Sequence, residues 1–285
     1  MAGASMKDIK IRIKSVESTM QITKAMELVA SSKLRHAKER VEKARPYFTT
    51  LHAALTDIAY SNTEFASPFI AKREVKKVCY VVIAGDRGLA GGYNSNIFKA
   101  VETAAGSAAY SVLPIGKKSV EYFERRKKDL VTKHYANVED VNIGDCFEMG
   151  KILADGFLKG DFDELYLVYT NFVSMLSQVP ATVKMLPVNY DEEYAKQSGP
   201  KNLIQYEPSS EAVFDNIVPQ YIAGMIYGGL SESWASELGA RRTAMDAASK
   251  NAGEMISDLS LKYNRARQAS ITQELTEIVS GAEAL

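Results

Sequence analysis

Cysteine, histidine and tryptophan are scarce in this chain of 285 residues, which contains two, three and one of them. Cys79 and Cys146 lie far apart and form no CxxC pair, so we expect buried, reduced thiols and no disulfide framework. The histidines, His36, His52 and His134, lack the spacing of metal ligands. We therefore expect no metal site in this chain.

Long apolar runs and an excess of one charge are also missing. No run approaches the roughly 18 to 20 apolar residues of a membrane helix, so we expect no direct membrane insertion. Lys and Arg total 35, as do Asp and Glu, and this balance gives no reason to expect nucleic acid as a partner. No apolar signal-peptide core follows Met1, so we expect a cytoplasmic protein.

Motifs of catalysis and of nucleotide binding are absent as well. The glycines of the turn at residues 85–92 never fall as GxGxxG, and no GKS or GKT ends that turn. Neither HExxH nor GxSxG occurs. We expect no catalytic residue and no cofactor, and we interpret the turn as a tight strand-to-helix connection.

What the sequence does contain is a long helix-forming segment at each end, over about residues 5–55 and 209–285. The first has a capping-box pattern at Ser5 and Asp8, and no proline follows Pro219 in the second. The part after Pro219 could span on the order of 100 Å at about 1.5 Å per residue, whereas a compact domain of this size is roughly half as wide. The two ends are therefore expected to pair as an extended antiparallel coiled coil.

Apolar residues in both segments recur in steps of three and four, as on the seam of a coiled coil. In the C-terminal segment, the stripe predicted from this spacing consists of Leu238, Met245, Ala248, Ala252, Met255, Leu259, Ala266 and Ala269, and it is interrupted by Arg241 and Lys262. In the N-terminal segment, the predicted stripe starts with Ile9, Ile13, Val16 and Met20, shifts to Ile22, Met26 and Val29, and shifts again to Leu34, Ala37 and Val41.

The middle of the chain alternates strand and helix patterns. Strands are expected at residues 78–84, 111–115, 165–169 and 182–187, and helices from about 95, at 117–127 and at 144–158. This order predicts a mostly parallel sheet in a small Rossmann-like domain. The expected fold class is α/β, with a long coiled coil of the terminal helices, divided into residues 1–60, 61–208 and 209–285.

Charge is distributed unevenly between the two ends. Residues 1–57 carry eleven Lys and Arg against six Asp and Glu, whereas residues 209–285 carry six against ten. Two helices of opposite charge attract each other, and this attraction is one explanation. The other is that the basic stretch faces an acidic partner; it comprises Lys33, Arg35, Lys38, Arg40, Lys43 and Arg45.

Three segments carry a resemblance to a known family: residues 22–33 (ITKAMELVASSK), 86–94 (DRGLAGGYN) and 263–282 (YNRARQASITQELTEIVSGA). They resemble the signatures of the gamma subunit of F-type ATP synthases, and the similarity runs from the first helix to the last. The bacterial form is the most similar, because there is no transit peptide and no cysteine-bearing regulatory insert.

The resemblance implies a rotor shaft without a catalytic site of its own. In that family the coiled coil turns inside a hexamer of alpha and beta subunits, and the globular end sits with the epsilon subunit on the ring of c subunits. Such a shaft couples ion-driven rotation to ATP synthesis or hydrolysis on the beta subunits, at the cytoplasmic face of the bacterial membrane. The ion is a proton or sodium.

The resemblance also implies partner contacts at particular positions. Those that match the zone facing the acidic lever of beta are Lys24, Met26, Lys33 and Arg35. Those that match a contact with a beta loop, or the surface beside it, are Arg241, Gln268, Thr272 and Glu274. Tyr206 and Glu207 resemble the foot that contacts the c-ring.

Apolar residues cover more than one face of the last helical turns, as at Ile271, Leu275, Ile278 and Val279, and such a helix needs burial from other chains. Two alternatives to the rotor remain from the residues alone. One is an α/β nucleotide-binding protein with a coiled-coil arm, and the other is a passive coiled-coil scaffold.

Overall fold

The computed structural model describes residues 6–60, 66–71, 73–106, 108–188 and 206–283. Two compact units divide the chain: one combines the described residues up to Ser31 with those from Arg241 onward, and the other is Ser32–Ala240. The two longest helices, α1 (Met6–Tyr60) and α6 (Ser210–Glu283), each contribute to both units. Ser5 of the expected capping box lies outside the described residues.

The larger unit contains a five-stranded sheet in the order β3-β2-β1-β4-β5. Its strands are β1 (Val78–Ile83), β2 (Tyr110–Ile115), β3 (Asp129–Leu130), β4 (Glu164–Phe172) and β5 (Gln178–Leu186). All neighbours pair in parallel except β4 and β5, which are antiparallel. The prediction of a mostly parallel sheet is confirmed, although the two-residue β3 was not predicted.

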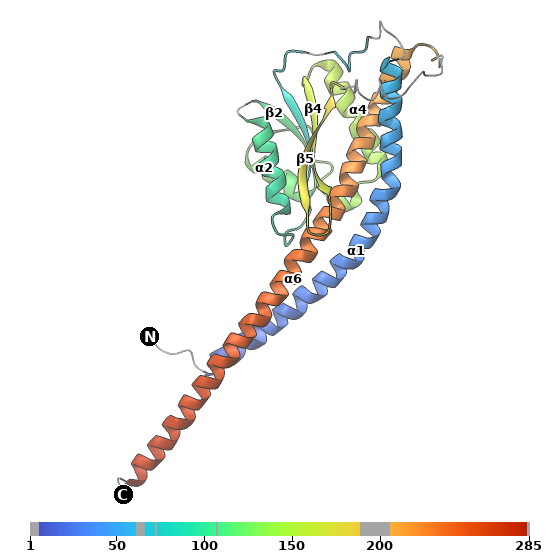
Figure 1. Cartoon of the computed structure of the whole chain (residues 1–285). Helices are drawn as coiled ribbons and strands as arrows, with labels where there is room; N and C mark the ends of the chain where they lie inside the picture. Colours follow the sequence, from blue (N-terminus) through green and yellow to red (C-terminus); the bar gives the residue numbers. More distant parts are fainter. Residues whose placement is uncertain (1–5, 61–65, 72, 107, 189–205, 284–285) are drawn as a thin grey trace. The chain divides into compact units, whose positions relative to one another are not determined.

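Helices cover both faces of this sheet (Figure 1), and alternate residues of β1 explain why. Val78, Tyr80 and Val82 pack with α2 (Tyr93–Ala105) and α3 (Lys117–Arg125). Cys79 and Val81 face the larger core, which α4 (Ile143–Lys159) and the first half of α6 complete. Burial on both faces makes β1 a continuous apolar run. The only remaining element of the described residues is the short 3-10 helix η1 (Val138–Asp140).

Both long helices continue through a proline. Pro46 lies inside α1 and Pro219 lies inside α6, which begins at Ser210. The Ser209 hydroxyl accepts a hydrogen bond from the Ala212 N–H and so satisfies one of the amides at the helix start. Close packing of α4 on α6 explains Gly150, because a Cβ there would lie 2.3 Å from the Pro219 carbonyl oxygen.

In the smaller unit, the paired face of α1 follows one heptad stripe without a shift. The stripe consists of Ile9, Ile13, Val16, Met20, Thr23, Glu27 and Ala30, which are all buried or half-buried, and Met26 beside it is half-buried as well. The predicted shift to Ile22 and Val29 is wrong, since these side chains are 58% and 57% exposed. Helix geometry keeps the inward face fixed, so Thr23 and Ala30 lie inward although larger apolar residues are adjacent. In the larger unit, Leu34, Ala37 and Val41 pack with Ala235 and Leu238.

On α6 the predicted stripe is half right. Met245, Ala252, Leu259 and Ala266 lie on the seam, but the alternate positions are one residue later than predicted, at Ser249, Ile256, Tyr263 and Ser270. Met255, Lys262 and Ala269 are exposed. Lys262 therefore does not interrupt the seam, and Tyr263 takes its place. A stripe that steps by three and then four residues coincides at every second position with one that steps by four and then three. The sequence of α6 fits both stripes, and only the position of the partner helix selects one of them.

Candidate partner-contact surfaces

Polar groups of the glycine-rich turn are used to hold the turn itself. The Gly85 N–H donates to Asn94 Oδ1 at 2.9 Å, and the Asp86 carboxylate accepts from the backbone N–H groups of Lys117 and Val138. These bonds tie the end of β1 to α2, α3 and η1. No described residues form a cluster of three or more His, Cys, Asp or Glu side chains able to hold a metal ion. Within the described part of the chain, no helix has the length and apolarity needed to cross a bilayer.

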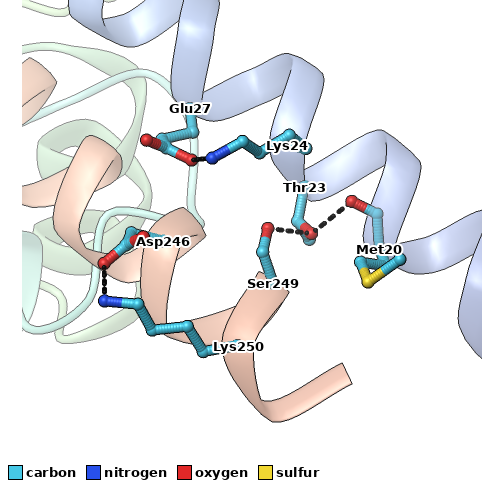
Figure 2. A network of polar contacts seen from close by, with 7 residues as sticks. All are labelled: Met20, Thr23, Lys24, Glu27, Asp246, Ser249 and Lys250. Atoms are coloured by element: carbon cyan, nitrogen blue, oxygen red, sulfur yellow. Dashed lines mark hydrogen bonds and ion pairs between the residues drawn. The ribbon is translucent and has the colours of Figure 1, made fainter. Parts of the chain in front are cut away.

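A polar network links α1 and α6 within the smaller unit (Figure 2). The hydroxyl oxygens of Thr23 and Ser249 lie 2.7 Å apart, and Thr23 also donates to the Met20 carbonyl oxygen at 3.0 Å. Thr23 is 9% exposed. The chain therefore places a hydrogen-bonded pair of hydroxyls in an otherwise largely apolar seam.

Two ion pairs flank this hydrogen bond, one on each helix. Lys24 Nζ lies 2.9 Å from Glu27 on α1, and Lys250 Nζ lies 2.8 Å from Asp246 on α6. The hydrogen bond from Lys250 lowers the pKa of Asp246, and the positive charges of Lys24 and Arg242 lower it further. The hydrogen bond to Asp246 likewise raises the pKa of Lys250, with a smaller contribution from Glu27. Lys24 on α1 thus also attracts Asp246 on α6, and Glu27 on α1 attracts Lys250 on α6.

Residues predicted to face the beta lever fall into different environments. In the smaller unit, the Lys24 side chain is 58% exposed although it pairs with Glu27, and Met26 is half-buried. In the larger unit, Lys33 is exposed and lies 3.5 Å from Glu139, and Arg35 is exposed. Lys24 and Lys33 therefore each have an acidic neighbour within the chain.

The predicted contacts on α6 lie at two heights of one helix. Arg241 is half-buried, whereas Gln268, Thr272 and Glu274 are exposed. Thr272 donates its hydroxyl to the Gln268 carbonyl oxygen, and Ser270 donates to Glu274. From Ile271 to Ser280 every residue is exposed. The described part of the chain does not cover this apolar segment, as predicted.

The predicted foot belongs to the larger unit. Tyr206 is half-buried and packs against the main core just before α6, whereas Glu207 is exposed. The ten predicted residues are divided between the two units. The smaller unit contains Lys24, Met26, Arg241, Gln268, Thr272 and Glu274, and the larger unit contains Lys33, Arg35, Tyr206 and Glu207.

Sequence reasoning missed two features of the helix pair. The first is the polar pair of Thr23 and Ser249, whose signal is a small hydroxyl residue at a heptad position on each helix. The second is a run of exposed apolar side chains on the outer face of α1, formed by Ile11, Ile22, Leu28 and Val29. Apolar residues on a face that points away from the partner helix suggest contact with other chains.

Comparison with known proteins relates this arrangement to one family. The family model described as ATP synthase matches residues 5–285. The gamma chain of ATP synthase from Ruminococcus albus is 49% identical over 284 residues, which cover 98% of each chain. The chain belongs to the ATP synthase gamma chain family.

Other members of the gamma chain family match over the same length. The Alkaliphilus metalliredigens gamma chain is 48% identical over 99% of both chains, and one from Acetobacterium woodii, described as sodium ion specific, is 42% identical over 99% of both. Among solved structures, a chain of the Euglena gracilis mitochondrial ATP synthase has a TM-score of 0.67 at 17% identity, covering 98% of this chain and 94% of its own. A chain from the central stalk and c-ring of the Tetrahymena thermophila mitochondrial ATP synthase has a TM-score of 0.61 at 24% identity. The match covers 80% of this chain and 99% of that one. These structures share the fold.

Proposed function

We propose that the chain is the central-stalk rotor subunit of a bacterial F-type ATP synthase. It couples ion-driven rotation of the c-ring to ATP synthesis or hydrolysis on the beta subunits, and it supplies no catalytic residue. The observation that carries this proposal is the match to bacterial gamma chains over essentially the whole of both chains. The exposed apolar end of α6 supports it, because such a surface needs a sleeve formed by other chains.

The proposed partners are the alpha and beta subunits, the epsilon subunit and the c-ring, at the cytoplasmic face of the membrane. The paired ends of α1 and α6 would form the coiled-coil shaft, and residues 61–208 would form the globular part. On this proposal Lys24, Met26, Lys33 and Arg35 face the beta lever. Arg241 and Gln268 bond a beta loop, with Thr272 and Glu274 beside it, and Tyr206 and Glu207 contact the c-ring. The transported ion is a proton or sodium.

An asymmetric shaft in a near-threefold sleeve favours different conformations of the three beta subunits, and rotation changes which one each adopts. The test is reconstitution of the full chain with alpha and beta subunits, followed by measurement of ATP hydrolysis together with rotation of a bead attached to the chain. Rotation in steps driven by ATP is expected. Hydrolysis with a stationary chain would mean a passive scaffold, and nucleotide binding by the chain alone would favour an enzyme.

A further inference from the structure

The direction of the hydrogen bond between Thr23 and Ser249 follows from the chemistry of a hydroxyl. Thr23 donates its single hydroxyl hydrogen to the Met20 carbonyl oxygen, so it can only accept from Ser249. Both hydroxyls are then satisfied, and the bond joins α1 to α6 at a defined height. An axial displacement by two residues, about 3 Å, would lengthen a 2.7 Å contact that lies across the axis to about 4 Å, which is beyond hydrogen-bonding range.

The flanking charges prefer the same alignment. Lys24 attracts Asp246 across the pair, and Glu27 attracts Lys250, while each also has a partner on its own helix. Figure 2 shows one ion pair on each helix, both beside the hydroxyl contact. Sliding of one helix along the other moves each cross-helix attraction out of alignment. Apolar contacts of the seam are not directional and resist small axial displacements much less.

We propose that Thr23 and Ser249, with the crossed charges around them, form an axial clamp that stops α1 and α6 from sliding past each other at the height of Lys24 and Met26. The clamp is a positioning device, since neither hydroxyl contacts a reacting group. It rests on the proposed rotor function in one respect, because the α1 face that carries Met26 must follow α6 when the shaft turns. Without the clamp, torque on α6 is partly lost in shear between the helices.

A clamp differs from a simple stabilising contact in what its removal does. Replacing both partners of a buried hydrogen bond by apolar groups of similar shape is often neutral or stabilising, and polar seam residues confer specificity at a cost in stability. The double variant Thr23→Val with Ser249→Ala should therefore keep or raise thermal stability while it frees axial motion. The swapped variant, Thr23→Ser with Ser249→Thr, should keep the bond.

Matched controls exist one or two turns away on the same helices. Thr19 makes the same kind of bond to a backbone carbonyl on α1, at Ser15, but is exposed. Ser257 is exposed on α6. The control variant Thr19→Val with Ser257→Ala therefore removes the same atoms outside the seam.

Axial motion is measured on the full chain by electron spin resonance distances between labels at Lys10→Cys and Ala247→Cys. Both positions are exposed. Because Thr23 lies level with Ser249, the two labels are about 15 residues apart in height, roughly 22 Å along the axis, and sliding of one helix along the other changes the distance between them directly. We expect the Thr23→Val, Ser249→Ala variant to broaden the distance distribution by at least the roughly 1.5 Å rise of one residue. The control and swapped variants should retain the narrow distribution. An unbroadened double variant, or a control that broadens equally, would overturn the clamp.

The same variants in the reconstituted enzyme test the consequence for rotation. At least a twofold fall in ions pumped per ATP hydrolysed is expected for the apolar double variant, with recovery in the swapped variant. Unchanged pumping per ATP would overturn the link between clamp and coupling. If the unmodified chain fails to assemble with alpha and beta, the proposed function fails, while the distance measurement still decides whether the clamp exists.

Discussion

At the scale of single residues, Cys79 and Cys146 are free thiols buried in the main core, as the sequence predicted. Burial raises the pKa of each thiol to about 12, because the thiolate loses its solvation. The reactive thiolate is then almost absent at neutral pH. We expect no labelling by a maleimide at pH 7.5 in the folded chain and two labels per chain in denaturant. Rapid labelling of the folded chain would show that this core opens.

The carboxylate of Asp163 makes the stability of the fold depend on pH. It accepts hydrogen bonds from the backbone N–H groups of Lys76 and Lys77, and these bonds lower its pKa. A lowered folded-state pKa stabilises the fold above the unfolded value of about 3.9, and the contribution disappears as pH falls through the folded value.

The variant Asp163→Asn should therefore be less stable than the unmodified chain at pH 7, and the difference should shrink at pH 3. Urea denaturation at both pH values measures this. The control is Asp161→Asn, at an exposed position nearby, for which we expect a smaller loss of stability at pH 7. A gap for Asp163→Asn that is equal at both pH values would rule out the carboxylate as its source.

At the scale of elements, two glycines on packed helices should respond oppositely to the same substitution. At Gly150 on α4 a new Cβ would meet the Pro219 carbonyl oxygen of α6, whereas at Gly253 on α6 nothing lies within 4 Å. Gly150→Ala should destabilise the fold by about 1 to 3 kcal/mol through overpacking. Gly253→Ala should stabilise it by roughly 0.5 to 1 kcal/mol by reducing the freedom of the unfolded chain. Thermal denaturation of both variants is the measurement, and equal shifts would contradict this view of the packing.

The elements also show how far sequence reasoning extends. Long periodic helices and the buried β1 were predictable because each depends on residues close in sequence. Which residues of α6 face α1 was not predictable, because Met255 and Ile256 are both apolar and only the position of α1 selects Ile256. Nor was β3, whose two residues have little propensity of their own and pair only because β2 lies beside them.

Candidate contact residues were predictable only through resemblance. Exposure of Gln268 or Arg35 is ordinary for a polar side chain on a helix, and nothing local distinguishes a contact from a solvated residue. Thr23 was missed for the opposite reason. A search for apolar residues passes over a threonine, although its hydroxyl can be satisfied inside a seam by a backbone carbonyl and a second hydroxyl.

At the scale of the whole molecule, coupling should be sensitive to Met26. A lysine there adds a second cation near Lys24 and, on the proposed function, creates an attraction to an acidic lever that each rotation step must break. We expect Met26→Lys to reduce ion pumping more than ATP hydrolysis in the reconstituted enzyme. Gln21→Lys adds the same charge at an exposed polar position and should have the smaller effect. An equal loss of pumping and hydrolysis would reject this placement of Met26.

Arg241 and Gln268 test whether contacts at different heights act separately. They are 27 positions apart on the single helix α6, which is roughly 40 Å at about 1.5 Å per residue, so they cannot bond to each other. Alanine at either position should slow turnover with assembly largely kept, and the double variant should be nearly additive. ATPase rates of the single and double variants measure this. Strong coupling between them would mean that both contact one loop or one rotor state.

Residues 271–280, all of which are exposed, have a consequence for the energetics of assembly. A helical segment without tertiary contacts is held only by propagation from the preceding turns, and it frays from its free end. Amide hydrogen exchange along α6 should therefore quicken progressively toward the C-terminus in the isolated chain. A sleeve that encloses this segment must first suppress the fraying, so part of the binding energy is spent on ordering the helix, and the affinity is lower than the buried area suggests.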